Sequence, residues 1–230
     1  MKRIDDVISE NEIDIALNWT DQLNYRSYSP SQHLYLELLK IDIEKNFDSF
    51  IYYSYLVLKA WDMDSRGAKL AEFKKYCDVL TNQKQKILNM HQNQEECCEG
   101  LCKTLPKKEL EALFDLLKPI VGARRNKGER KTHLVAVSKL MHFMFPYAIP
   151  PIDRKYTSGI LHFSFNPGDE KIKFIAVIED YHNFIETNKD AFQKYCMPYR
   201  TIDVSDIKTL TWNTTAMKAC DNLLIWKSKK

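Results

Sequence analysis

Hydrophobic and polar residues alternate with a helical period along almost the whole chain. Apolar residues that recur every three or four positions are typical of helices that bury one face. The stretch 49–61 is apolar on most of its faces, so we expect it to lie centrally in the fold. The predicted helices cover residues 31–44, 49–61, 68–80, 107–121, 132–145, 153–163, 170–186 and 206–227.

The segments between these stretches carry helix-capping, helix-breaking and polar residues. Ser29-Pro30 suits the entry to the first predicted helix, and Asp48 is a candidate N-cap for the second. The stretch 146–153 is rich in proline and cannot be helical up to Pro151. The other interruptions are a polar break at 62–67, a polar and irregular stretch at 82–106 and a basic connector at 122–131.

The pattern therefore predicts an all-α protein. The sequence has no internal repeat and no low-complexity linker, so we expect one helical domain over residues 1–230. We expect a two-lobed bundle with a cleft between lobes 1–105 and 106–230, and a helix–basic loop–helix element across the connector 122–131. Val, Ile and Tyr are common enough that one or two short strands are an alternative for some segments.

Composition narrows the class of protein. Apolar residues make up 44% of the 230 residues and charged residues 28%, a globular balance that excludes a disordered chain. Only 6 Gly and 8 Pro are present, too few for a sandwich or barrel with frequent turns. The net charge is +3, from 34 basic and 31 acidic residues, so a nucleic-acid surface has to be local.

The sequence also bears on compartment and cofactors. No run approaches the ~20 apolar residues of a membrane span, and the N-terminus lacks the apolar segment of a secretory signal. We therefore expect a cytoplasmic protein whose cysteines are reduced, with no membrane partner. His91 with Cys97, Cys98 and Cys102 fits no familiar zinc spacing, so we expect neither a metal nor a cofactor.

The basic connector is the first candidate for function. Backbone amides freed by Gly122 and Gly128, followed by a helix beginning near Thr132, suit a phosphate oxygen. The alternative is a solvated charge run, which is what most such runs are. Gly122 is also the predicted end of the preceding helix. The basic residues of the connector are Arg124, Arg125, Lys127, Arg130 and Lys131, against the single acid Glu129.

The stretch 138–157 holds the second candidate. Lys139 lies beside Val135 and His142, off the predicted core face of its helix, which comprises Leu134, Val137, Met141 and Met144. The prolines then deliver Asp153 to the start of the next helix, where the helix dipole favours a carboxylate. The alternative is that Asp153 serves only as an N-cap.

The polar break after the central helix is the third candidate. Trp61 and Met63 stand next to Asp64 and Arg66, so an aromatic, a flexible apolar side chain and a charge pair are close in sequence. Such a group suits a base pocket, because flipped-out bases stack on aromatic rings and are read at their edges. The alternative is a helix–helix corner in which Trp61 belongs to the core.

The order of elements in this part of the chain resembles that of the helix-hairpin-helix base-excision DNA glycosylases. It runs from a helix through a basic turn to a helix with a lysine, then through a proline-containing stretch to Ile152-Asp153, which leads into another helix. Asp153 matches the aspartate of that family, Gly122 and Gly128 match the hairpin glycines loosely, and Lys139 resembles the Schiff-base lysine of lyase-competent members. The Leu-Pro-Gly-Val-Gly hairpin and the four-cysteine iron–sulfur motif are missing, and Lys139 stands about one helical turn late.

The resemblance implies a DNA glycosylase that hydrolyses the N-glycosidic bond of a flipped-out base and leaves an abasic site. Bacterial relatives include anti-phage enzymes acting on hypermodified bases, so both phage defence and base-excision repair are open roles. We expect a monomer that acts on double-stranded DNA, with monofunctional chemistry favoured. The alternative is a non-catalytic helical DNA-binding or sensor module. The expected residues are Asp153 and Lys139 for catalysis, Arg124, Arg125, Lys127, Arg130, Lys131, Arg154 and Lys155 for DNA binding, and Trp61, Asp64, Arg66 and Tyr156 for the base pocket.

Overall fold

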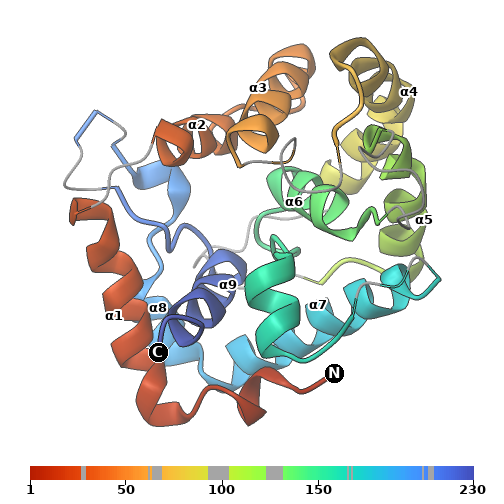
Figure 1. Cartoon of the computed structure of the whole chain (residues 1–230). Helices are drawn as coiled ribbons and strands as arrows, with labels where there is room; N and C mark the ends of the chain where they lie inside the picture. Colours follow the sequence, from red (N-terminus) through yellow and green to blue (C-terminus); the bar gives the residue numbers. More distant parts are fainter. Residues whose placement is uncertain are drawn as a thin grey trace.

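The fold is helical, as the periodicity predicts (Figure 1). The computed structural model describes residues 1–26, 30–61, 63, 69–92, 104–122, 132–164, 166, 168–203, 205–206 and 210–230. Its α-helices are α1 (Glu10–Arg26), α2 (Pro30–Leu39), α3 (Phe47–Ala60), α4 (Phe73–Gln92), α5 (Lys107–Leu117), α6 (Leu134–Met144), α7 (Glu170–Thr187), α8 (Lys189–Tyr195) and α9 (Ala216–Lys227). Short turns of helix are η1 (Ile4–Asp6), η2 (Lys118–Ile120), η3 (Arg154–Ser158) and η4 (Tyr199–Thr201).

The helices pack in an order that differs from their order in the chain. The N-terminal helix α1 packs against the C-terminal helix α9 and against α8, while α9 also contacts α7 and η3. On the other side, α3 packs with α2, α4 and α6, and α5 packs with α4, α6 and α7 (Figure 1). Because α1 packs against α9, a lobe that contains one of these helices also contains the other.

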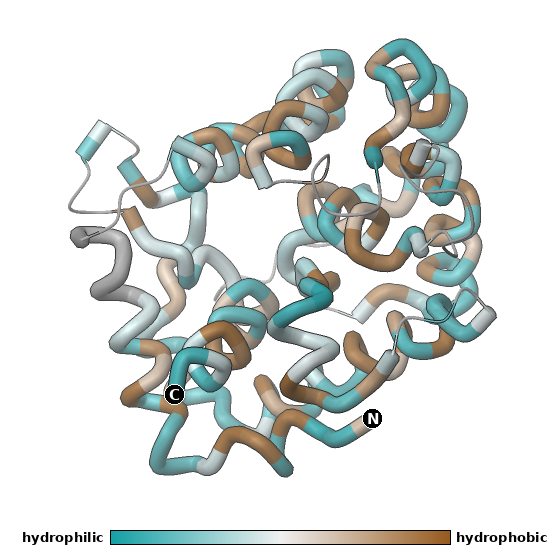
Figure 2. Tube along the Cα trace, in the orientation of Figure 1, coloured by the Kyte–Doolittle hydropathy of each residue, from teal (hydrophilic) through white to brown (hydrophobic). Residues whose placement is uncertain are grey.

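The core runs through α6, which lies between helices of both sides. Leu134, Val137, Met141 and Met144 are each fully buried, as their spacing predicts. The outer helices instead alternate hydrophobic and hydrophilic residues along their length (Figure 2). On α4 the buried residues are Tyr76, Leu80, Ile87 and Met90, a single stripe at helical spacing.

Several predicted boundaries are wrong. The helix predicted at 31–44 ends at Leu39, and α3 begins at Phe47 with Asn46 in the N-cap position, so Asp48 lies in the first turn and is not the cap. The stretch 82–106 is predicted to be irregular, yet α4 continues to Gln92. The polar residues of this part of α4 lie on its outer face, while Ile87 and Met90 continue the buried stripe. The helix persists because its apolar residues keep the helical period, even though most of its residues are polar.

The C-terminal helix is also shorter than predicted. It begins at Ala216 rather than near residue 206, because the Thr215 side chain accepts a hydrogen bond from the Lys218 amide and caps the helix there. The helix predicted at 107–121 ends at Leu117 and continues only as the short turn η2, so Gly122 does not terminate it. The helices α1 and α8 have no counterpart among the predicted helices.

Gly122 has a packing role in this fold. Its amide donates to the Lys69 carbonyl at 2.7 Å, beside an isolated antiparallel bridge between Leu70 and Val121. A Cβ at this position would stand 3.1 Å from the Leu70 oxygen and 3.2 Å from the Ala71 Cα, which is tighter than ordinary contact. The glycine therefore allows two backbones to approach closely. That bridge is the extent of β-structure in the described residues.

Candidate functional site

The structure describes six of the predicted site residues. These are Trp61, Lys139, Asp153, Arg154, Lys155 and Tyr156. The base-pocket candidates Asp64 and Arg66 lie outside the described residues. So do the five basic residues of the connector, which are Arg124, Arg125, Lys127, Arg130 and Lys131.

Four of the six described residues line one cavity of about 200 Å³: Trp61, Lys139, Asp153 and Tyr156. Trp61 follows the last residue of α3, Lys139 lies on α6, and the other two lie at the start of η3. The opposite wall comes from α9 and the residues before it, and from Thr20 on α1. Besides Thr20, the polar and aromatic residues of this wall are Trp212, Lys218, Asp221 and Asn222. Segments from both ends of the chain and from its middle therefore form this cavity.

Asp153 is held by hydrogen bonds from the turn that follows it. Its Oδ1 accepts the amide of Lys155 at 2.7 Å and the amide of Tyr156 at 3.3 Å. Asp153 therefore caps η3, the role that the sequence left open as the alternative to catalysis. The prolines before it are non-helical as predicted, and the next turn is π-helical rather than α-helical.

The second oxygen of Asp153 faces a cation. Oδ2 lies 3.7 Å from the Nζ of Lys139, and only 11% of the aspartate side chain and 7% of the lysine side chain are exposed. The same ammonium lies 5.3 Å from the centre of the Trp61 ring, a cation–π distance. Lys139 lies outside the core stripe of α6 but is buried all the same, because it points into the cavity rather than into solvent.

A second ion pair forms the opposite wall. Lys218 Nζ donates to Asp221 Oδ2 at 3.0 Å and to Asn222 Oδ1 at 2.5 Å, and it lies 5.6 Å from the centre of the Trp212 ring. These residues are spaced i, i+3 and i+4 on α9, which places them on the same side of the helix. Burial raises the pKa of the Asp221 carboxyl, while the Lys218 ammonium opposes that rise.

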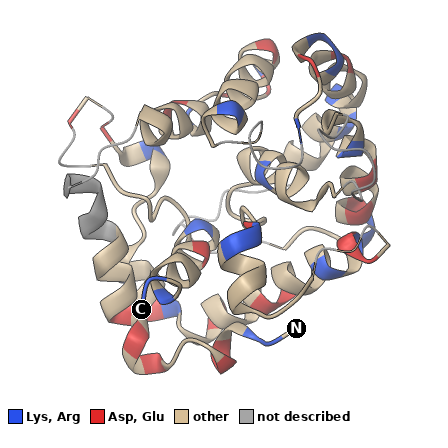
Figure 3. Ribbon diagram, viewed as in Figure 1, with Lys and Arg blue, Asp and Glu red and all other residues tan. Residues whose placement is uncertain are grey.

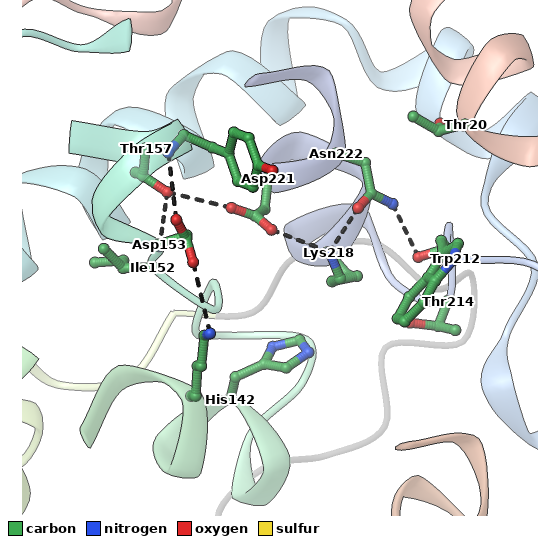
Figure 4. A network of polar contacts seen from close by, with 12 residues as sticks. Thr20, His142, Ile152, Asp153, Thr157, Trp212, Thr214, Lys218, Asp221 and Asn222 are labelled. Carbon is green, nitrogen blue, oxygen red and sulfur yellow. Dashed lines mark hydrogen bonds and ion pairs between the residues drawn. The ribbon is translucent and has the colours of Figure 1, made fainter. Parts of the chain in front are cut away.

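A threonine hydroxyl joins the two ion pairs. Thr157 Oγ1 accepts the backbone amide of Asp153 at 3.0 Å and donates to Asp221 Oδ1 at 3.2 Å. Figure 4 follows these contacts from Asp153 through Thr157 to Asp221, and on to Lys218 and Asn222. The carboxylates of the two walls are thus fixed relative to each other by one side chain that is itself fully buried.

The buried side chain of Tyr35 packs against both tryptophans that line the cavity. The ring of Tyr35 lies 5.1 Å from that of Trp61 and 6.1 Å from that of Trp212, measured between centroids. Its hydroxyl meets His142 Nε2 at 2.6 Å and Thr214 Oγ1 at 3.1 Å. Burial lowers the pKa of His142 to about 3, so its ring is neutral at pH 7. A neutral ring donates from Nδ1 to the Ile149 carbonyl and accepts the Tyr35 hydroxyl at Nε2.

The other two described candidates lie at the surface beside the cavity. Arg154 and Lys155 are exposed, and the Lys155 ammonium lies 5.2 Å from the centre of the Tyr156 ring. Figure 3 shows basic residues at the start of η3 and on α9. The structure therefore places cations both inside the cavity and next to it.

The described residues form neither a metal site nor a helix that could span a membrane. Within the described ranges, no group of three or more His, Cys, Asp or Glu side chains is arranged to hold a metal ion. Among the described residues, Cys77, Cys196 and Cys220 form no disulfide bond, while Cys97, Cys98 and Cys102 lie outside the described residues. None of the described helices has the length and apolarity that crossing a membrane requires.

Comparison with family models, with curated proteins and with solved structures gave no match. The resemblance to helix-hairpin-helix glycosylases therefore remains a prediction.

Sequence reasoning missed half of the site. It assigned no role to Trp212, Lys218, Asp221 and Asn222, which lie within one long predicted helix. A signal was present, since three polar residues at i, i+3 and i+4 interrupt a helix whose other residues are mostly Ala, Met, Leu and Ile. Polar residues that share a face in a helix of otherwise apolar composition point either to an internal network or to a cavity.

Proposed function

We propose that the chain is a DNA N-glycosylase that accepts a flipped-out base in the cavity beside Asp153. One observation carries the proposal. A buried carboxylate lines a cavity with one oxygen fixed by two backbone amides and the other facing the Lys139 ammonium. The two amides belong to the turn that Asp153 caps, so the fold itself orients this carboxylate.

The size and walls of the cavity suit a heterocyclic base. A cavity of about 150 Å³ in another protein accepts benzene, and this one has about 200 Å³. Trp61 and Trp212 both line it, and extruded bases stack on aromatic rings of this kind. The polar groups are few and fixed, as is usual in sites that orient a small ligand.

The proposed chemistry is cleavage of the bond between base and sugar. As the base departs, positive charge develops on the sugar, and the fixed negative charge of Asp153 stabilises it or orients the attacking water. Lys139 holds the carboxylate in place and balances its charge before substrate binds. Burial lowers the pKa of His142 to about 3, so this side chain is a weak proton acceptor near pH 7.

We favour monofunctional hydrolysis over strand cleavage. A Schiff base would require the Lys139 amine to reach the sugar carbon as a neutral nucleophile. This ammonium pairs with the Asp153 carboxylate and lies over the face of Trp61. Both partners stabilise the charged form, which is not nucleophilic.

The proposal extends to the DNA backbone. Arg154 and Lys155 are exposed next to the cavity, where cations would hold phosphates on either side of an extruded nucleotide. The basic connector would add further phosphate contacts, and the cavity would then lie in a cleft between two helical lobes. We propose a monomer that acts on double-stranded DNA, in base-excision repair or in defence against phage.

A non-catalytic DNA-binding module is the second candidate, and one observation favours it. Asp153 caps η3, and a protein that only binds DNA needs it for nothing more. The two candidates differ in whether DNA leaves the protein chemically changed. A binder produces no abasic site, while a glycosylase produces one for each base released.

The deciding experiment is mass spectrometry of bases released from a panel of modified and unmodified phage DNAs. Alkaline cleavage of the same DNA reports abasic sites independently. We expect release of at least one base by the parent protein, and release by Asp153→Asn that is slower by a factor of about 10²–10³. DNA binding without release from any member of the panel would reject the glycosylase and favour the binding module.

A further inference from the structure

The α9 wall of the cavity holds a polar cluster that the proposed chemistry does not use. Lys218 is 5% exposed, Asp221 is 3% exposed and Asn222 is 3% exposed, so all three are buried. Burying a charged pair often stabilises a fold no more than apolar packing of the same volume does. The cluster therefore invites a role in recognising what enters the cavity.

The hydrogen bonds of Asn222 fix its orientation. Its amide nitrogen donates to the Trp212 carbonyl at 3.0 Å and to Asn213 Oδ1 at 2.9 Å. Asn213 is held in turn, because its own amide donates to the Leu17 carbonyl at 3.0 Å. The Asn222 oxygen is thereby directed at the Lys218 ammonium. This orientation follows from the donors and acceptors around it.

Lys218 is consequently a preorganised donor. An ammonium has three N–H groups. In the described structure two of them donate to Asp221 and Asn222, which leaves one for a ligand in the cavity. The nearby Trp212 ring restricts the direction of this group further, since the ammonium lies 5.6 Å from the ring centre. A base stacked in the cavity would meet this N–H at its edge.

We propose that Lys218 reads a keto group on the bound base, at position 6 of a purine or position 4 of a pyrimidine. This inference rests on the proposed function and names its substrate class. A lysine ammonium pairs with the O6 and N7 acceptors of guanine, and the O4 of thymine or uracil is an acceptor of the same kind. An amino group at that position would set N–H against N–H, and the bound base would lose a hydrogen bond at a buried donor.

Ligand pairs that differ at one position give the sharpest measurement. Inosine and adenosine differ in the keto or amino group at position 6, and uridine and cytidine differ likewise at position 4. Calorimetric titration of the whole protein with each nucleoside gives a keto/amino affinity ratio. We expect roughly a 10- to 100-fold preference for the keto member of a pair, the usual discrimination by a well-placed donor.

Three variants assign the preference to Lys218. Lys218→Met removes the ammonium and should bring the ratio to within about twofold. Because that change leaves Asp221 as an unpaired buried charge, the neutral pair Lys218→Met/Asp221→Asn serves where the single variant folds poorly. Lys227→Met is the matched control, since Lys227 lies on the same helix but pairs with Glu12 outside the cavity lining. It should retain the full ratio.

The outcomes separate this inference from the proposed function. A keto preference that Lys218→Met abolishes supports the inference even if no base is released from DNA, and the glycosylase alone is then rejected. If bases are released from DNA but both nucleosides of each pair bind with equal affinity, the recognition by Lys218 is rejected and the glycosylase is not. A preference for the amino member would assign the reading to the Asp221 carboxylate, and competition by inorganic phosphate would make the cluster an anion site. Either result, or no binding of any nucleoside, overturns the inference.

Discussion

Replacing Asp153 by Asn tests the buried ion pair and the proposed chemistry together. Asparagine caps helices about as well as aspartate, so its oxygen should retain the bonds from the Lys155 and Tyr156 amides. What the change removes is the negative charge facing Lys139. The variant therefore separates the cap, which it preserves, from the ion pair, which it breaks.

The geometry of the pair sets the expected loss of stability. Unit charges 3.7 Å apart attract by about 4.5 kcal/mol at an effective dielectric constant of about 20. Removing one partner of a buried pair costs about 3–5 kcal/mol, because the other charge remains buried. The neighbouring Asp221 offsets part of this cost, since its carboxylate also interacts with Lys139. We expect Asp153→Asn to lower the free energy of unfolding by about 3 kcal/mol.

A double-mutant cycle measures the pair directly. Lys139→Met removes the stranded charge, so adding it to Asp153→Asn should recover most of the loss and give a coupling energy of about 2–3 kcal/mol. Urea denaturation supplies the free energies. The control is Asp42→Asn, because Asp42 also accepts two backbone amides and pairs with Lys45, but at the surface. Exposed pairs contribute little, and this control should leave stability almost unchanged.

The same variant should lose base release. A well-placed electrostatic group contributes about 10²–10³ in rate, so single-turnover release by Asp153→Asn should fall by at least that factor. Additive stabilities in the cycle would refute the ion pair. Release within about threefold of the parent rate, from folded protein, would refute the catalytic role and leave Asp153 as a cap.

Three further predictions concern other parts of the molecule. Tyr35→Phe removes the donor to the buried Nε2 of His142, so unfolding free energy measured in urea should fall by about 1–3 kcal/mol, and no change would mean that the hydroxyl is not the donor. The Lys227 ammonium lowers the pKa of Glu12 from 4.5 to about 2, so the carboxylate stabilises the fold fully above pH 4.5 and this contribution disappears as the pH falls towards 2. Glu12→Gln should therefore cost about 1 kcal/mol at pH 7, a value discounted for the partial exposure of the pair, and progressively less in acid denaturation curves below pH 4.5. Charge reversal of Arg124 and Arg125 in the connector should reduce the slope of log K against log salt by about 0.9 for each phosphate that the protein no longer neutralises. An unchanged slope in fluorescence anisotropy would place DNA binding elsewhere.

Local signals predicted one wall of the cavity. The apolar spacing of α6 identified its core face, and Lys139 stood out as a charge beside it. Two prolines followed by Ile152-Asp153 identified the end of an extended stretch and the cap of the next turn. Each of these signals lies within a few residues of sequence, where periodicity and backbone stereochemistry act.

The other wall depends on packing between distant segments. Asp221 meets Thr157 across 64 positions of sequence, and Asn213 meets Leu17 across 196. No local pattern encodes that α1 packs on α9, because each helix has several apolar residues with which other helices would pack equally well. The i, i+3 and i+4 spacing of Lys218, Asp221 and Asn222 is visible in the sequence. That these residues line a cavity follows only from the fold, which brings residues of α6 and η3 opposite α9.

The charges of the cavity themselves bear on its role. Each wall of the cavity carries one ion pair: Lys139 with Asp153 on one wall, and Lys218 with Asp221 on the other. The described lining therefore carries equal numbers of positive and negative charges. Apolar residues of the same volume would stabilise the fold as well or better, because each buried ion loses its hydration. A cavity built only for stability therefore does not account for them. A balanced set of fixed charges does suit a substrate that is neutral when it binds and develops positive charge as it reacts, because Asp153 can then favour the charged state over the neutral one.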